Sequence, residues 1–246
     1  NTVRGGCYRS RWLRDLCISQ DVNDLMASIY QTEISPHTMP VHLGHLNYQP
    51  SKLEEAVDKW HHDTIPLDYV MMVSDPATLS GGGFEYFLGT KMEVEELSKQ
   101  GKTPPRDRVK APKFPGPGYA VALHGNMVVH RGAPLTKPGE RITMVNPYVS
   151  KDCLVDDQSH SRDLIGIDDP AALYTEWAKH SSWRTQNRLK QIIDSMAFDQ
   201  EPDQVLDQLE FAANDLLKTI NDMKAGPREA QHLSLIHISE PTRRLN

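Results

Sequence analysis

One histidine and one aspartate stand two residues apart in this sequence, at His61 and Asp63. We expect them to lie on a strand, where side chains two apart leave by the same face, so both could reach one metal ion. His62, between them, would then point away. His130, on a later strand, could supply a third ligand. Two imidazoles and one carboxylate on one face of a metal leave its other positions open to small molecules.

An arginine follows His130 at the start of a further expected strand. Arg141 carries a planar, permanently charged guanidinium, which binds a carboxylate through paired hydrogen bonds. Thr143 shares its strand face and can add a hydroxyl donor. In the alternative interpretation His130 is a core histidine and Arg141 a surface cation, since isolated residues of both types are common. The occurrence of all these residues together favours a functional set.

The centre of the chain predicts a succession of short strands separated by turn residues. Apolar or alternating segments are bounded by glycine, proline and asparagine, and no helix alternates regularly with them. This pattern is typical of a sandwich or jelly roll and leads us to expect a mainly β fold with flanking helices. The expected strands are 41–49, 64–73, 84–88, 119–123, 127–130 and 141–149.

The remaining segments predict a division of the chain around a core at 41–150. Residues 1–40 read as a helical or irregular segment, and 91–118 as an insertion with a charged helix and a proline-rich loop. Residues 151–227 predict a C-terminal helical pair, with apolar residues at helical spacing. We expect this pair mainly to buttress the core, and it is also a candidate dimer surface.

The final residues, 228–246, form a tail outside this division. Residues 233–243 resemble the translation of a sequencing adapter, so we expect an artefact there; the alternative is a genuine, poorly ordered tail.

Composition excludes several classes of partner. A net charge of -6 and a pI near 6.0 give no general attraction to nucleic acid. No apolar run approaches the roughly 20 residues of a membrane span. The three cysteines, Cys7, Cys17 and Cys153, are widely spaced and odd in number, which indicates reduced thiols in a cytoplasmic compartment.

In their order along the chain, His61-x-Asp63, His130 and Arg141 resemble the signature of the 2-oxoglutarate and Fe(II)-dependent dioxygenases. The resemblance covers about residues 41 to 149. It implies a double-stranded β-helix, or jelly-roll, core in which His61, Asp63 and His130 bind the metal and carry the catalysis.

Two further motifs support this resemblance and imply cosubstrate contacts. Arg141-Ile142-Thr143 resembles the Arg-x-Ser pair that binds the distal carboxylate of 2-oxoglutarate, with threonine in place of serine. Asn47-Tyr48 resembles the start of the Asn-Tyr-Tyr-Pro strand of the plant-type branch. This implies Tyr48 as a further contact, although Gln49-Pro50 departs from that pattern.

The activity that the resemblance implies uses Fe(II), 2-oxoglutarate and O2, and releases succinate and CO2. The substrate would be an unidentified small molecule that is hydroxylated or desaturated. Halogenation is disfavoured because the Asp63 carboxylate leaves no ligand position free for a halide. The alternatives are a cupin-type dioxygenase or isomerase that needs no 2-oxoglutarate, and a non-catalytic binding or scaffold protein.

Overall fold

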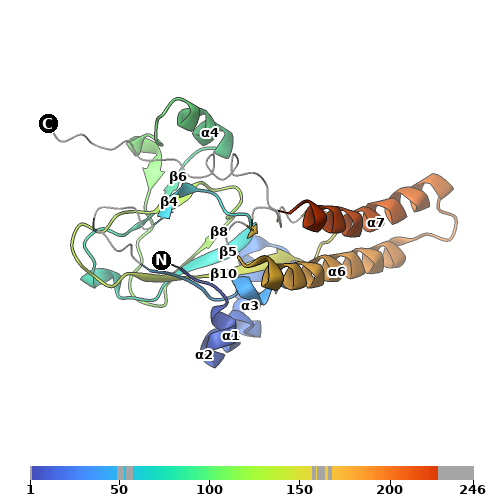
Figure 1. The fold of residues 1–246 in the computed structure, drawn as a ribbon, viewed down its shortest axis with the longest axis horizontal. Helices are drawn as coiled ribbons and strands as arrows, with labels where there is room; N and C mark the ends of the chain where they lie inside the picture. The colour runs from blue at the N-terminus through green and yellow to red at the C-terminus, as the bar shows by residue number, and fades with distance from the viewer. Residues whose placement is uncertain are drawn as a thin grey trace.

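The computed structural model describes residues 2–48, 53, 58–156, 159, 164–165 and 168–226. Two antiparallel β-sheets form its centre (Figure 1). The larger sheet has the order β1-β3-β10-β5-β8, with β2 also paired to β10, and the smaller has the order β4-β9-β6-β7. The larger sheet comprises β1 (Thr2–Val3), β2 (Ile34–Pro36), β3 (His45–Tyr48), β5 (Leu67–Met72), β8 (Ala120–Leu123) and β10 (Ile142–Ser150). The smaller comprises β4 (Asp58–His61), β6 (Phe84–Phe87), β7 (Val109–Lys110) and β9 (His130–Gly132).

Helices flank both sheets and account for more of the chain than the sequence pattern indicated. The longest strand, β10, has 9 residues, whereas α6 and α7 have 26 and 24. Two antiparallel sheets with flanking helices are confirmed, but "mainly β" was wrong for the described residues. The α-helices are α1 (Gly6–Arg9), α2 (Arg11–Cys17), α3 (Gln20–Tyr30), α4 (Lys91–Lys99), α6 (Pro170–Ser195) and α7 (Pro202–Ala225). Short 3-10 helices are η1 (Pro40–His42), η2 (Pro76–Thr78) and η3 (Arg106–Arg108).

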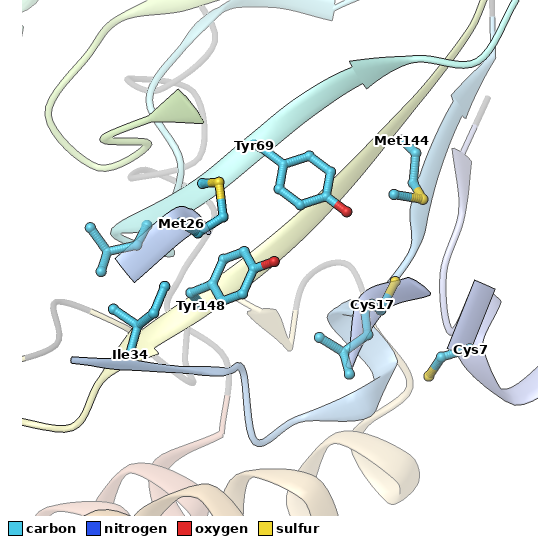
Figure 2. Packing of buried hydrophobic residues seen from close by; sticks show 9 residues of the cluster. Cys7, Cys17, Met26, Ile34, Tyr69, Met144 and Tyr148 are labelled. Carbon is cyan, nitrogen blue, oxygen red and sulfur yellow. The ribbon is translucent and has the colours of Figure 1, made fainter. Parts of the chain in front are cut away.

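The two faces of the central strand β10 have different surroundings, a cavity on one side and the hydrophobic core on the other. Thr143 and Val145 face a cavity between the two sheets. Met144 and Tyr148, which alternate with them, are fully buried on the opposite face. There they pack with residues from α1, α2 and α3, as Figure 2 shows for part of this core. The N-terminal helices therefore cover one face of the larger sheet and leave the other face for the cavity.

The smaller sheet has its own apolar layer on the side away from the cavity. Trp60 and Phe87 from this sheet pack with Val129 and with Val94 of α4. Trp60 is thus a packing residue. The helix α4 begins at a capping box in which Thr90 and Glu93 bond each other's backbone N–H groups. It covers the outer face of the smaller sheet (Figure 1).

Helices α6 and α7 form an antiparallel hairpin that extends away from the sheets (Figure 1). The apolar stripe of α6 lapses at Ser181 and Ser182, and the helix continues through this point. The hydroxyl groups of Ser181 and Thr219 lie 2.7 Å apart, so the break in the apolar stripe is a polar contact with α7. Near its start, α6 is anchored to the part of the protein that contains the sheets, which we call the body. Leu173 and Trp177 make this contact by packing with Met39.

Truncating the anchor of this hairpin is expected to destabilise the protein. Leu173 is 0% exposed, so Leu173→Ala leaves a cavity and should lower the free energy of unfolding by about 2–5 kcal/mol. The matched control is Ile193→Ala near the other end of the same helix, where the side chain is 70% exposed. We expect the control to change stability by less than about 0.5 kcal/mol. Urea titration followed by circular dichroism measures both, and equal effects would contradict the packing described here.

Consecutive strands of the chain do not always share a sheet. β8 belongs to the larger sheet, whereas β9, which follows it in the sequence, belongs to the smaller one. The first 40 residues add β1 and β2 to the larger sheet. The expected adapter-derived segment, 233–243, lies outside the described residues.

A search of the described helices found none that is both long and apolar enough to cross a membrane.

Candidate metal centre

His61 and His130 are brought together by the pairing of β4 with β9. The two residues are direct partners across these antiparallel strands, and their ring centres lie 4.4 Å apart. Each ring is oriented by its own backbone: Nδ1 of His61 lies 2.6 Å from the carbonyl oxygen of Lys59, and Nδ1 of His130 lies 2.9 Å from that of Val128. A carbonyl oxygen only accepts, so both Nδ1 atoms carry a proton, and in the neutral rings both Nε2 atoms offer a lone pair.

The Asp63 carboxylate lies between these two lone pairs. Its oxygens are 3.4 Å from Nε2 of His61 and 3.5 Å from Nε2 of His130. The ligand atoms of all three residues fall within 4.8 Å of one another. Metal–ligand bonds of about 2 Å place two ligands of one ion roughly 3 to 4 Å apart. A small movement of these three side chains toward one another would therefore accommodate an ion. His62 is not part of this group, although the expected strand alternation is not the reason, because β4 ends at His61.

The position of Asp63 depends on a loop from another part of the chain. β4 ends at His61, and beyond it the Asp63 N–H donates to the Gly125 carbonyl oxygen at 2.8 Å. Burial would raise the pKa of the Asp63 carboxyl, but the neighbouring His130 and His61 outweigh burial and bring this pKa below its ordinary value. The group is therefore a carboxylate at neutral pH, the form that binds a metal.

A second carboxyl group, Asp68 on β5, lies beside Asp63 and was missed in the sequence. Its side chain is 1% exposed, and burial, together with the adjacent charge of Asp63, raises its pKa well above the ordinary value. A hydrogen bond joins the two side chains. Strand alternation places Asp68 on the same face as Val70, and both line the cavity. The sequence could therefore have predicted that Asp68 points toward the cavity, but not that it contacts Asp63.

Gly125 leaves room for both carboxyl groups, and substituting it should disturb the metal site. A Cβ atom there would lie 2.7 Å from Asp63 Oδ2 and 2.4 Å from Asp68 Oδ2. We expect Gly125→Ala to displace Asp63 and weaken Fe(II) binding by about 10- to 100-fold, the range for residues that orient ligands. Gly116→Ala is the control, because a Cβ atom there meets nothing within 4 Å. Calorimetric Fe(II) titration under nitrogen compares the two, and equal affinities would refute the contact.

The candidate ligands open onto a cavity of about 320 Å³ between the sheets. The smaller sheet contributes the two histidines, and the larger sheet contributes Thr143 from β10. Arg141, just before β10, is 2% exposed and also lines the cavity. Its Nε donates to the Gly82 carbonyl oxygen at 2.5 Å, and its Nη1 lies 3.4 Å from the Thr143 hydroxyl. The structure thus brings together five of the six residues singled out in the sequence.

Tyr48 is the exception. In the pairing of β3 with β10, Asn47 lies opposite Thr143 and Tyr48 opposite Ile142. Asn47 lines the cavity with Thr143, whereas Tyr48 alternates with it and is not among the lining residues. The structure therefore places Asn47, the neighbour of Tyr48 on the same strand, at the cavity.

The cavity also contains a polar group from the N-terminal part of the chain. Arg4 pairs with Asp168 at 2.6 Å and lies 2.6 Å from Nδ1 of His42 and 3.4 Å from Nδ1 of His45. Burial and the charge of Arg4 lower the pKa of both histidines, that of His45 to about 4. Both histidines line the cavity. Arg4 gave no sequence signal, since β1 is only two residues long.

Comparisons with known proteins were made at the level of sequence and of structure. No protein-family model matches the chain, and no curated protein matches it. Among solved structures, it is similar to the non-heme alpha ketoglutarate dependent epimerase SnoN from nogalamycin biosynthesis, with 13% identity and a TM-score of 0.42 over 61% of each chain. It is also similar to the nickel complex of the non-heme monooxygenase ThoJ, with 14% identity and a TM-score of 0.42 over 73% of this chain and 76% of that one.

The structure of ThoJ without a ligand gives a comparable result, with 14% identity and a TM-score of 0.41 over 76% of this chain and 78% of that one. Both proteins are described as non-heme enzymes.

Proposed function

We propose that this protein is an Fe(II)- and 2-oxoglutarate-dependent oxygenase whose two sheets form a double-stranded β-helix. One observation carries the proposal: the lone pairs of His61 and His130 and the carboxylate of Asp63 converge on one wall of a cavity whose other wall presents Arg141 and Thr143. A candidate metal-binding group and a candidate carboxylate-binding group thus share one cavity.

The donor set suits ferrous iron. Two neutral imidazoles and one carboxylate are the ligands of the facial triad of non-haem Fe(II) oxygenases, which leaves the remaining positions for exogenous molecules. The bound iron, with 2-oxoglutarate and O2, supplies oxidative chemistry that converts the oxo acid to succinate and CO2 while a substrate is hydroxylated or desaturated. His61, Asp63 and His130 are the proposed catalytic residues because they hold the iron.

Arg141 and Thr143 bind and orient the cosubstrate in this proposal. The Gly82 carbonyl oxygen accepts from Nε of Arg141 and fixes the plane of the guanidinium. Its terminal nitrogens, with the Thr143 hydroxyl, can then donate to the distal carboxylate of 2-oxoglutarate. Asn47, opposite Thr143 on β3, can add an amide donor to the same end of the cavity. Burial strengthens these contacts by excluding water.

The proposed substrate is a small molecule. The cavity volume of about 320 Å³ lies at the lower end of the range for small-molecule sites, roughly 300–1,000 Å³, and the cosubstrate occupies part of it. Arg4, His42 and His45 supply the remaining polar wall. Cys7, Cys17 and Cys153 are buried and form no disulfide with one another, which suits a reducing compartment such as the cytoplasm.

Anaerobic titration with Fe(II) and 2-oxoglutarate tests this proposal without knowledge of the substrate. A chelate of the oxo acid on iron absorbs visible light, so a band should appear only when both are present. Admission of air should then lead to succinate formation, which a coupled assay detects. A folded protein that binds Fe(II) but shows no band with 2-oxoglutarate would contradict the proposal.

A further inference from the structure

Helix α7 carries a row of exposed apolar side chains along the hairpin. Leu206, Leu209, Leu216 and Ile220 are 58%, 48%, 39% and 45% exposed, and Ala213 between them is also exposed. We call these five residues the α7 seam. At 1.5 Å per residue, the seam is about 21 Å long. Soluble monomers rarely expose a continuous apolar surface of this kind, which usually marks an interface.

The partner helix α6 does not cover the seam, because it contacts a different face of α7. Arg188 of α6 pairs with Asp215 at 2.5 Å, and the hydroxyl of Ser181 bonds that of Thr219. Ala212, on the same face as these two α7 residues, is only 2% exposed. These contacts place α6 on the face of α7 that carries Ala212, Asp215 and Thr219. The leucines and isoleucine of the seam are left on the flank of the helix.

The spacing of the seam indicates what covers it. Positions 206, 209, 213, 216 and 220 alternate steps of three and four residues, which is the heptad pattern of a coiled coil. Such a seam packs best against another helix with the same repeat. We propose that α7 pairs with α7 of a second copy of this chain in an antiparallel homodimer, whose centre is a bundle of two hairpins.

The antiparallel direction follows from side-chain size and charge. In this arrangement Leu209 faces Ile220 of the partner, and the small Ala213 faces the larger Leu216. Asp203 and Lys224, both exposed beside the seam, then approach each other across the two-fold axis, once at each end. In a parallel pair these two residues would lie about 31 Å apart along the helices and could not meet. Opposite charges across the seam therefore favour the antiparallel pair.

The place of the hairpin in the fold supports the same direction. Met223, near the C-terminal end of α7, packs against the body, whereas the turn between α6 and α7 projects away from it (Figure 1). Antiparallel pairing puts the two bodies at opposite ends of the bundle. Ile193, Met196 and Phe198 add exposed apolar side chains around the turn, 70%, 40% and 107% exposed.

Sedimentation velocity on the full chain tests this proposal. The wild type should sediment as a dimer of the 27.8 kDa chain at tens of micromolar concentration. Leu209→Glu with Leu216→Glu places charges in the seam and should weaken dimerisation on the order of 100-fold or more. Asn214→Glu, an exposed position of the same helix outside the seam, is the matched control and should remain dimeric. Circular dichroism checks that all variants keep their helix content.

A charge exchange then tests the antiparallel direction. Asp203→Lys alone brings like charges together and should weaken the dimer about two- to tenfold. Adding Lys224→Asp to it should restore the dimer. A wild-type monomer, a dimer that survives the double glutamate substitution, or a charge exchange that does not restore affinity would each overturn the proposal. In a wild-type monomer, the seam would instead be covered by the chain's own residues 227–246 or by a different protein.

Discussion

Asp63→Ala is expected to abolish the visible band that Fe(II) and 2-oxoglutarate produce together, and with it succinate formation. Asp63 is the only one of the three candidate ligands that carries a negative charge, and its oxygens lie 3.4 and 3.5 Å from the two histidine Nε2 atoms. Its loss should weaken Fe(II) binding by more than the roughly 10- to 100-fold that substitutions behind the ligands cost. Anaerobic titration followed by absorbance measures the effect directly.

The control for this variant is Asp107→Ala, which removes a carboxylate at an exposed position on η3. It should bind iron and 2-oxoglutarate as the wild type does. Asp63→Ala must also retain the circular dichroism spectrum of the wild type, so that lost binding reports on the site. If Asp63→Ala keeps both the band and the iron affinity, the metal lies elsewhere and the proposed ligand set is wrong.

Arg141→Ala should separate binding of the cosubstrate from binding of the metal. Removing the guanidinium takes away the charged donors for the distal carboxylate, so we expect the KM for 2-oxoglutarate to rise roughly 100-fold or more. Fe(II) affinity should change little, because Arg141 is not among the ligand atoms. Arg141→Lys keeps the charge but loses the paired hydrogen bonds, so its KM for 2-oxoglutarate should lie between that of the wild type and that of Arg141→Ala.

The exposed Arg106 provides the control, since Arg106→Ala removes a cation without reaching the cavity. A cupin-type enzyme that needs no oxo acid gives the opposite result, in which Arg141→Ala leaves turnover nearly intact. Because iron binding is measured in the same samples, a misfolded variant can be distinguished from one that has lost only its cosubstrate site.

Local rules were enough to find the residues that share a strand face. Alternation along β10 places Thr143 toward the cavity and Met144 in the core, and the structure agrees. The same rule, applied to β3, would have chosen Asn47 over Tyr48 once the register with β10 was known. That register depends on two strands almost a hundred residues apart, which no local pattern specifies.

Residues that act through long-range contacts could not be predicted from the sequence. Arg4 reaches the cavity because a two-residue strand joins the edge of the larger sheet, and Gly125 matters because its loop lies against two buried carboxyl groups. Helix α6 gives another example, since Arg188 interrupts its apolar stripe yet is 2% exposed through its pairing with Asp215. The spacing of apolar residues predicts which face of a helix is buried. It does not predict that a polar residue is buried because its partner lies on another helix.

The division of the cavity between two sheets has a consequence for stability. The candidate ligands His61 and His130 belong to the smaller sheet, while Thr143 belongs to the larger one. Under the proposed function, an oxo acid bound to iron at one end and to the Arg141 region at the other would connect two sheets between which the described residues form no backbone hydrogen-bond ladder. Because such a molecule would bind only the assembled pair, its binding energy would also oppose separation of the sheets. The spacing between the sheets, set by the packing around the cavity, would then determine the length of dicarboxylate that fits.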